Sequence, residues 1–147
     1  MQVLFGTQND WAGFILRVSL GCVMLPHGAQ KTFGWFGGYG FLATMDFFTK
    51  SMKLPWIISL LVILIEFVGA IGLIFGFASK VWALGLIVVM AGAIYTTNMK
   101  NGFFMNWFGN QSGEGYEYHL LVIAICIAIL LIGSGRYSID GIIQKSL

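Results

Sequence analysis

The sequence predicts an all-α integral membrane protein, built as a four-transmembrane-helix antiparallel bundle with a short interfacial amphipathic helix between the first and second spans. Its 147 residues are 58% hydrophobic and only 10% charged, whereas soluble globular chains carry about 25% charged residues. Four apolar runs are long enough to cross the hydrocarbon of a bilayer, which takes about 20 residues. We therefore expect a single membrane domain over residues 1–147.

The predicted spans follow the four apolar runs in chain order. They cover Trp11 to Phe33, Pro55 to Phe77, Lys80 to Asn98, and Tyr116 to Ser134. An even number of spans places both termini on one side of the membrane. Lysine and arginine are nearly balanced between the two sides, so the positive-inside rule does not choose an orientation.

The connection between the first two spans contains a helical pattern of its own. Apolar residues lie on one face and charged residues on the other: Phe41, Met45, Phe48 and Met52 recur at helical spacing, opposite Asp46, Lys50 and Lys53. This pattern is typical of a short amphipathic helix that lies in the membrane interface before Pro55 starts the second span. An ordinary loop helix packed on the bundle is an equally good interpretation.

Composition and motifs count against several function classes. The net charge of +2 is scattered, with no basic run that would bind nucleic acid. Cys22 and Cys126 lie in apolar runs and form no Cys-x-x-Cys pair, which counts against thiol–disulfide exchange. We find no metal-ligand spacing and no phosphate-binding glycine loop. Because Met1 to Asp10 carries no lysine or arginine, we expect no cleaved signal peptide.

Glu66, near the middle of the second span, is the residue that packing explains least. An ionisable side chain within a span normally faces the bundle interior and marks a functional site. We expect Glu66 to be either neutral or paired with a cation of the first span. The candidate cations are Arg17, His27 and Lys31, which fall near one face of that helix. The alternative is a buried ion pair that only fixes the register of the helices.

Polar residues from all four spans fall in the same half of the bilayer when their depth is counted at about 1.5 Å per residue. We expect them to line one pocket, in which Glu66, His27 and Glu117 are the candidate catalytic, proton-carrying groups. The candidate ligand-binding residues are Gln30, Lys31, Tyr95, Asn98, His119 and Arg17. Depth follows from counting residues, whereas the direction of each side chain around its helix does not.

Six short motifs run in order through nearly the whole chain. They are Leu16 to Gly21, His27 to Gly34 with the pattern His-Gly-x-Gln-Lys-x-Phe-Gly, Glu66-x-x-Gly69, Asn101 to Phe104, Gly115 to Tyr118, and Gly135 to Asp140. As an ordered set they resemble the DoxX family. The resemblance implies a four-helix protein of the bacterial cytoplasmic (inner) membrane, with cytoplasmic termini and an exoplasmic polar pocket. The family takes its name from subunits associated with quinone-linked sulfur oxidation and quinol oxidation.

Two functions stay open on these grounds. The first is a redox-linked membrane subunit that binds a quinone or similar apolar ligand, because a quinone needs an apolar slot, donors at its carbonyl oxygens and groups that handle protons. Such a subunit needs an electron-transfer partner, since the chain has no obvious electron carrier. The second is a non-catalytic accessory or scaffold subunit of a larger membrane protein complex.

Two further classes were weighed against these. In a haem b subunit, His27 and His119 would be the axial ligands, but bis-histidine ligation demands a stringent geometry. A transporter or channel is disfavoured by four short spans without visible inverted repeats. The expected partners are therefore the lipid bilayer and either other membrane subunits or further copies of this chain, and not nucleic acid.

Overall fold

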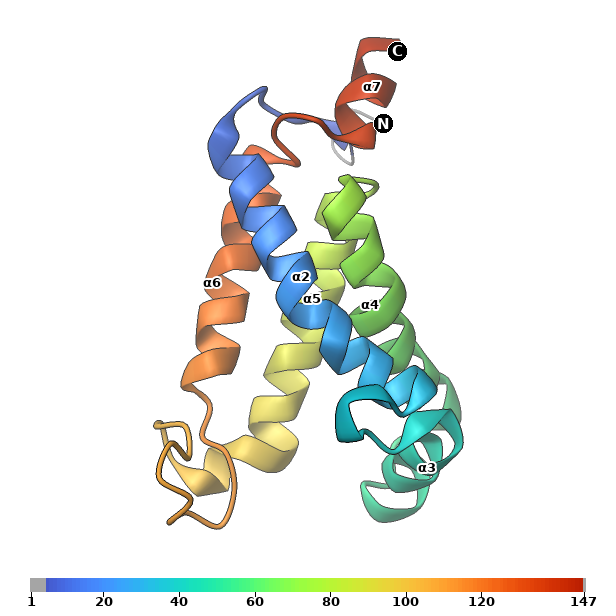
Figure 1. The fold of residues 1–147 in the computed structure, drawn as a ribbon, viewed down its shortest axis with the longest axis vertical. Helices are drawn as coiled ribbons and strands as arrows, with labels where there is room; N and C mark the ends of the chain where they lie inside the picture. The colour runs from blue at the N-terminus through green and yellow to red at the C-terminus, as the bar shows by residue number, and fades with distance from the viewer. Residues whose placement is uncertain (1–4, 147) are drawn as a thin grey trace.

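The computed structural model describes residues 5–146, and within this range the chain is helical, without strands (Figure 1). In chain order the elements are α2 (Trp11–Phe33), η1 (Trp35–Gly37), α3 (Gly40–Asp46), η2 (Phe47–Ser51), α4 (Trp56–Phe75), α5 (Ser79–Ala93), η3 (Ile94–Asn98), η4 (Met99–Asn101), α6 (Glu117–Ile132) and α7 (Ile139–Ser146). The α elements are α-helices or single helical segments, and the η elements are short 3-10 or π turns that extend or connect them.

Three segments are long and apolar enough to cross a membrane. They are α2, α4 and the continuous segment Ser79–Asn101, which joins α5 to η3 and η4. These segments confirm the predicted all-helical membrane class and the positions of the first three predicted spans. The fourth apolar helix, α6, has only 16 residues and is shorter than a typical spanning helix.

Backbone geometry sets the helix boundaries. The Asp10 carboxylate accepts a hydrogen bond from the Gly13 backbone N–H at 2.7 Å and caps the start of α2. Helix α2 continues through Pro26 and ends at Gly34, whose φ of 75° is left-handed. Helix α4 likewise ends at Gly76, with φ of 67°, so it stops two residues before the predicted end of the second span.

Helices α2 and α4 make the closest contact in the bundle, and α2 crosses α4 obliquely (Figure 1). Gly28 lies directly on the α4 backbone: a Cβ at this position would be 2.5 Å from the Phe67 Cα. One heptad earlier, a Cβ on Gly21 would be 2.8 Å from the Ala70 carbonyl oxygen. Small residues allow such approach in lipid, where helix association depends on close packing. This contact brings the polar end of α2 against Glu66.

The remaining helices pack on this pair through apolar side chains. The buried core contains Leu20, Met24, Ala70, Leu73, Ala83, Leu86, Val89, Met90, Val122, Cys126 and Ile129. Apolar residues also cover the outer faces, for example Ile57, Leu61, Leu64 and Val68 on α4. A helix that is apolar on its outer face as well as its inner face is typical of a bundle surrounded by lipid.

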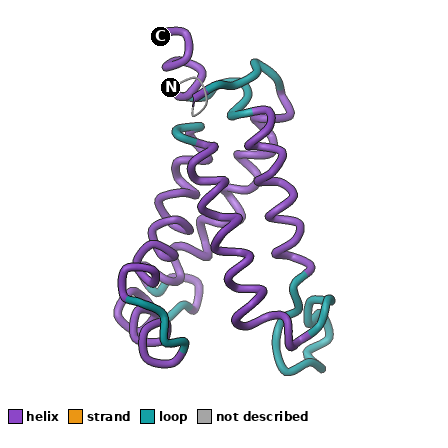
Figure 2. Tube along the Cα trace, turned by 180° about the vertical axis from the view of Figure 1, so that it is seen from behind, coloured by secondary structure: helices purple, strands orange, loops and turns teal. Residues whose placement is uncertain are grey.

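The connection between α2 and α4 is helical, as Figure 2 shows for the chain trace at the end opposite the termini. Helix α3 and turn η2 cover the predicted range Phe41 to Met52 almost completely. Within it Thr44 and Met45 are buried, whereas Leu42 is 80% exposed. Lys50 donates to the Asp46 carboxylate at 2.8 Å on the exposed side. A helix therefore forms where the pattern places one, and its position relative to a membrane is addressed as a proposal.

The two ends of the described chain meet at the opposite end of the bundle (Figure 1). The Thr7 backbone N–H donates to the Gln144 side-chain oxygen at 2.9 Å. The C-terminal helix α7 was not among the predicted elements, because its eight residues are too short for the search for spans. Helix α7 lies across the end of the bundle and supplies residues to the polar network there.

Candidate functional site

Polar residues gather at two separate places in the bundle, and Arg17 belongs to the one at the terminal end. Its guanidinium is fully buried and donates to five backbone carbonyls. The acceptors are Ser134 at 2.7 Å from Nε, Leu73 at 3.0 Å and Ile74 from Nη1, and Arg136 at 2.9 Å and Tyr137 at 2.8 Å from Nη2. The carbonyls of Leu73 and Ile74 end α4, where a cation is favourable because of the helix dipole.

Asp140 complements Arg17 on the neighbouring helix. Its carboxylate accepts from the backbone N–H groups of Ala78 at 2.7 Å and Ser79 at 3.0 Å, at the start of α5, and from the Ser134 hydroxyl. A carboxylate at a helix N-terminus satisfies N–H groups that have no partner within the helix. Arg17 and Asp140 thus fix the tight turn between α4 and α5 from both sides.

This network corrects the predicted role of Arg17. We expected Arg17 to share a ligand pocket with Glu66, or to pair with it. The structure instead uses its donors on backbone carbonyls at the terminal end of the bundle. The physical reason is that a buried guanidinium needs several acceptors, and the converging chain ends supply more of them than one carboxylate could.

The second polar place centres on an ion pair between Lys31 of α2 and Glu66 of α4. The Lys31 ammonium donates to the Glu66 Oε2. The side chain of Glu66 is 7% exposed and that of Lys31 is 26% exposed, so the pair is mostly buried. Of the three candidate cations, Lys31 is therefore the partner of Glu66. A charge pair at this depth is costly unless it serves packing, binding or proton handling.

Three ring side chains extend this place towards α6. The His27 ring lies 6.1 Å from the Tyr118 ring, and the Tyr118 ring lies 5.6 Å from that of His119, measured between centroids. The Tyr118 hydroxyl donates to the Met24 sulfur at 3.4 Å. His119 Nδ1 is buried and has no hydrogen-bond partner among the described residues. Helices α2 and α6 thus bring both predicted histidines to a common neighbour.

A pocket of about 540 Å³ opens beside the ion pair, between the end of α2 and the connection that follows it. Gln30 and Lys31 form its polar wall. Its other walls are Gly37, Gly38, Tyr39, Ala43, Thr44, Phe47 and Phe48. A Cβ on Gly38 would lie 2.4 Å from the Gln30 carbonyl oxygen, so glycine is needed for the loop to pass this close. The pocket therefore combines a cationic edge with an aromatic lining.

The other predicted site residues hold the connection between α5 and α6. The Glu117 Oε1 accepts from the Met105 backbone N–H at 2.9 Å and from the Trp107 indole N–H at 3.2 Å. The Asn98 amide donates to the Glu114 carbonyl at 2.9 Å. Tyr95 is 80% exposed on the outer face. These three residues are not brought to the pocket beside Lys31 and Glu66.

Comparison with known proteins gives the family. The sequence model described as DoxX matches residues 12–99 of this chain, which include Lys31 and Glu66. The chain belongs to the DoxX family. A curated protein of Bacillus subtilis (strain 168), named "Putative oxidoreductase CatD", is 30% identical over 131 residues, covering 89% of this chain and 86% of that protein. No solved structure matches the chain significantly.

Several residues of this DoxX protein's polar end were missed by the sequence analysis. Tyr118 lies between the two predicted histidines in the arrangement of rings, and Tyr39, Phe47 and Phe48 line the pocket. The motif at Gly115 to Tyr118 was noticed, yet nothing in it distinguishes an inward tyrosine from one at the membrane surface. The aromatic pocket residues were assigned to an interfacial helix, because their period reveals an apolar face but not what covers it.

Among residues 5–146 there is no group of three or more histidine, cysteine, aspartate or glutamate side chains placed to hold a metal ion. The described part of this DoxX protein therefore offers an ion pair, polar rings and an aromatic-lined pocket as its candidate site. Such a set can hold an apolar ring by its face, donate to a carbonyl oxygen and exchange a proton.

Proposed function

We propose that this DoxX protein is a redox-linked membrane subunit that binds a quinone, or a similar apolar ring compound with carbonyl oxygens, in the pocket beside Lys31. The observation that carries this proposal is the mostly buried Lys31–Glu66 ion pair at the edge of an aromatic-lined pocket of about 540 Å³. Small-molecule sites commonly fall in this size range and combine an apolar lining with few polar groups. The name of the Bacillus relative, a putative oxidoreductase, supports the redox class.

The residues of the pocket fit such a ligand. The Lys31 ammonium and the Gln30 amide can donate to a carbonyl oxygen, while Tyr39, Phe47 and Phe48 offer ring faces to an apolar ring. Glu66 lies behind Lys31 and can take or release a proton through it. A bound quinone would supply the two-electron, two-proton chemistry. The electrons would come from a partner protein, which the proposal therefore includes.

Removal of the Lys31 charge is expected to weaken quinone binding. In the Lys31→Gln variant we expect about a tenfold rise in Kd for a short-chain quinone, because one charge-assisted hydrogen bond is lost. Binding is measured on purified protein in mild detergent by tryptophan fluorescence quenching, and co-purified quinone by mass spectrometry. Lys50→Gln is the matched control, since Lys50 forms an exposed ion pair outside the pocket lining.

Equal affinities of wild type, Lys31→Gln and Lys50→Gln would overturn the assignment of the pocket. Size-exclusion profiles of the three proteins show whether each is folded. A visible haem absorption band in the same preparations would favour the alternative with His27 and His119 as axial ligands.

The second candidate function is a non-catalytic accessory subunit. The observation that favours it is a cluster of exposed aromatic residues in the connection before α6, where Phe104, Trp107 and Phe108 are 67%, 78% and 89% exposed. Glu114 and Glu117 hold this connection in one shape through backbone hydrogen bonds. A rigid aromatic surface is suited to contact with another membrane subunit. Absence of bound quinone together with a stable co-purifying subunit would favour this function.

We also infer four spans, with α6 as the fourth, α3 and η2 in the membrane interface, and both termini in the cytoplasm. Sixteen residues of α6 extend about 24 Å, somewhat less than the hydrocarbon thickness. Local thinning of the bilayer accommodates such a shortfall. Helix α6 packs along α5, so it occupies the same depth as the longer helices. The family resemblance supports the bacterial cytoplasmic membrane and the orientation.

Thiol labelling tests the span count and the orientation together. In a Cys22→Ala/Cys126→Ala background, single cysteines replace Ser112, before α6, and Ser146, at the end of α7; both serines are exposed. A membrane-impermeant maleimide added to intact cells is expected to label Ser112→Cys and to leave Ser146→Cys unlabelled until lysis. Equal labelling of both positions would show that α6 does not cross, and the reverse pattern would invert the orientation.

A further inference from the structure

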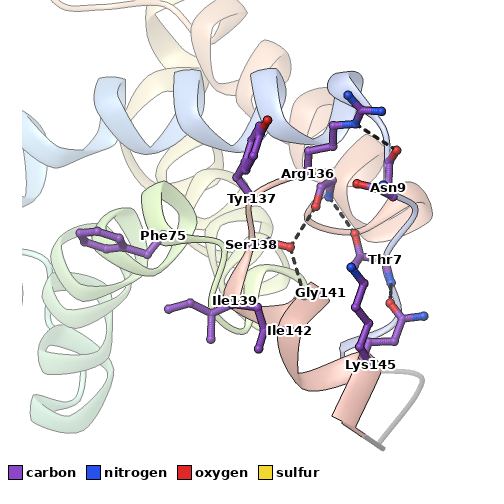
Figure 3. Close-up of a pocket in the computed structure, with 12 residues that line it drawn as sticks. Thr7, Asn9, Phe75, Arg136, Tyr137, Ser138, Ile139, Gly141, Ile142 and Lys145 are labelled. Atoms are coloured by element: carbon purple, nitrogen blue, oxygen red, sulfur yellow. Dashed lines mark hydrogen bonds between the residues drawn. The ribbon is translucent and has the colours of Figure 1, made fainter.

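A second and larger cavity lies at the terminal end of the bundle, far along the chain from the quinone pocket. It has a volume of about 870 Å³ and is bounded by the residues before α2, the end of α4, and α7 with the loop before it. Figure 3 shows the residues that line it. None of them belongs to the proposed quinone site, so the inference drawn from this cavity does not rest on the proposed function.

One half of this cavity is basic. Arg136 and Lys145 line it, and no aspartate or glutamate does. Neither cation forms an ion pair with a carboxylate of residues 5–146. Within that range the Arg136 side chain makes a single hydrogen bond, a long one of 3.5 Å from Nε to the Asn9 carbonyl, and its guanidinium lies 5.1 Å above the Trp11 ring. Its terminal amino groups are thus held near the cavity with donors to spare.

The nearest carboxylates are already used elsewhere. Asp140 is 1% exposed and caps the start of α5, and Asp10 caps the start of α2. The positive charge of Arg136 and Lys145 is therefore not neutralised by the acidic groups of this end. An anion that enters the cavity would meet two cations and no competing carboxylate among the lining residues.

The other half of the cavity is apolar. Phe75, Ile139 and Ile142 line it, and Figure 3 shows Ile139 and Ile142 on the side away from Lys145, facing towards Phe75. All three are exposed large hydrophobic residues. A free anion such as inorganic phosphate would leave this half uncovered. The combination of two cations with an adjoining apolar wall fits an amphiphile that has an anionic head and an alkyl chain.

We propose that this cavity binds one anionic phospholipid, with the phosphate between Arg136 and Lys145 and an acyl chain along Phe75 and Ile142. The short helix α7 then lies at the level of the headgroups, with its isoleucines towards the acyl region and Lys145 towards the phosphate. The lipid joins α7 to the end of α4, and α7 is the helix that carries Asp140. Lipid binding therefore reinforces the network that holds the turn between α4 and α5.

Native mass spectrometry of the full chain tests this proposal. The protein is released from mixed micelles that contain equal amounts of phosphatidylglycerol and phosphatidylcholine with identical acyl chains. We expect wild type to retain phosphatidylglycerol preferentially. The preference is expected to fall about fivefold for each cation removed, in Lys145→Gln and in Arg136→Gln/Lys145→Gln. Lys80→Gln/Lys100→Gln is the control, because it removes the same charge and Lys80 starts α5 at the same end, outside the cavity lining.

Further arms distinguish the possible sources of the effect. Ile142→Ser keeps the charge and, since Ile142 is 68% exposed, is expected to preserve the fold while weakening retention of phosphatidylglycerol. An excess of inorganic phosphate is expected to leave the lipid bound. The proposal is overturned if wild type shows no preference, if the control loses as much as the test variant, if Ile142→Ser has no effect, or if phosphate displaces the lipid.

Discussion

Replacement of Arg17 by methionine is expected to destabilise this DoxX protein by at least about 3 kcal/mol. The guanidinium donates to five carbonyls that come from the end of α4 and from the loop before α7. Methionine fills much of the volume but leaves those buried carbonyls without a donor, and each unsatisfied buried group costs about 1–3 kcal/mol. The loss is measured as a lower melting temperature in detergent and as a lower folded yield from membranes.

Two companion variants make the reason for this loss testable. Arg17→Lys keeps the charge but has three donors on one nitrogen in place of a planar fork, so it is expected to recover only part of the stability. Arg136→Met is the matched control, because the Arg136 side chain makes only the long hydrogen bond to Asn9 and is partly exposed. Wild-type melting of Arg17→Met would show that the carbonyl network contributes little.

The second large effect is expected at Glu66. Glu66→Gln keeps the size of the side chain and an oxygen that can accept from Lys31, but it removes the proton-binding carboxylate. We expect the folded yield to stay near that of wild type and quinone-dependent activity of the membranes to be lost. Yield, melting temperature and the rate of quinone reduction are measured on the same preparation. Asp46→Asn, in the exposed pair with Lys50, is the matched control and is expected to change none of them.

A third variant separates proton handling from a purely structural pair. Glu66→Leu strands the Lys31 ammonium and is expected to cost about 3 kcal/mol, at the lower end for a broken buried pair because Lys31 keeps 26% of its side chain exposed. If Glu66→Gln lowers the stability as much as Glu66→Leu while activity per folded molecule is retained, the pair only fixes the register of α2 and α4. Unchanged yield and unchanged activity in Glu66→Gln would remove Glu66 from the centre of the site.

Properties that depend on neighbouring residues could be predicted from the sequence alone. The apolar runs placed α2, α4 and the segment from Ser79 to Asn101, because the length and hydropathy needed to cross a bilayer are local properties. The alternation of apolar and charged residues placed a helix after the first span for the same reason. Glu66 and Lys31 were identified as partners or candidates because a charge within an apolar run has few places to go.

Tertiary structure decided which way each polar side chain points. The backbone of η3 (Ile94–Asn98) forms a π turn, which changes the angle between successive residues, and Tyr95 lies on the outer face. Glu117 and Asn98 bind the connection before α6, since that connection folds back over them with free backbone groups. None of these directions can be read from depth along a helix, because azimuth depends on how helices pack.

The clearest division lies between Lys31 and Arg17, two cations of one helix. The sequence by itself determined that both needed buried partners, since neither charge is tolerated by lipid alone. Only the fold decided that Lys31 meets Glu66, through the glycine contact at Gly28, while Arg17 meets carbonyls from the far end of the chain. Those carbonyls lie more than 100 residues away, and their arrival depends on α7 and its loop closing over the bundle.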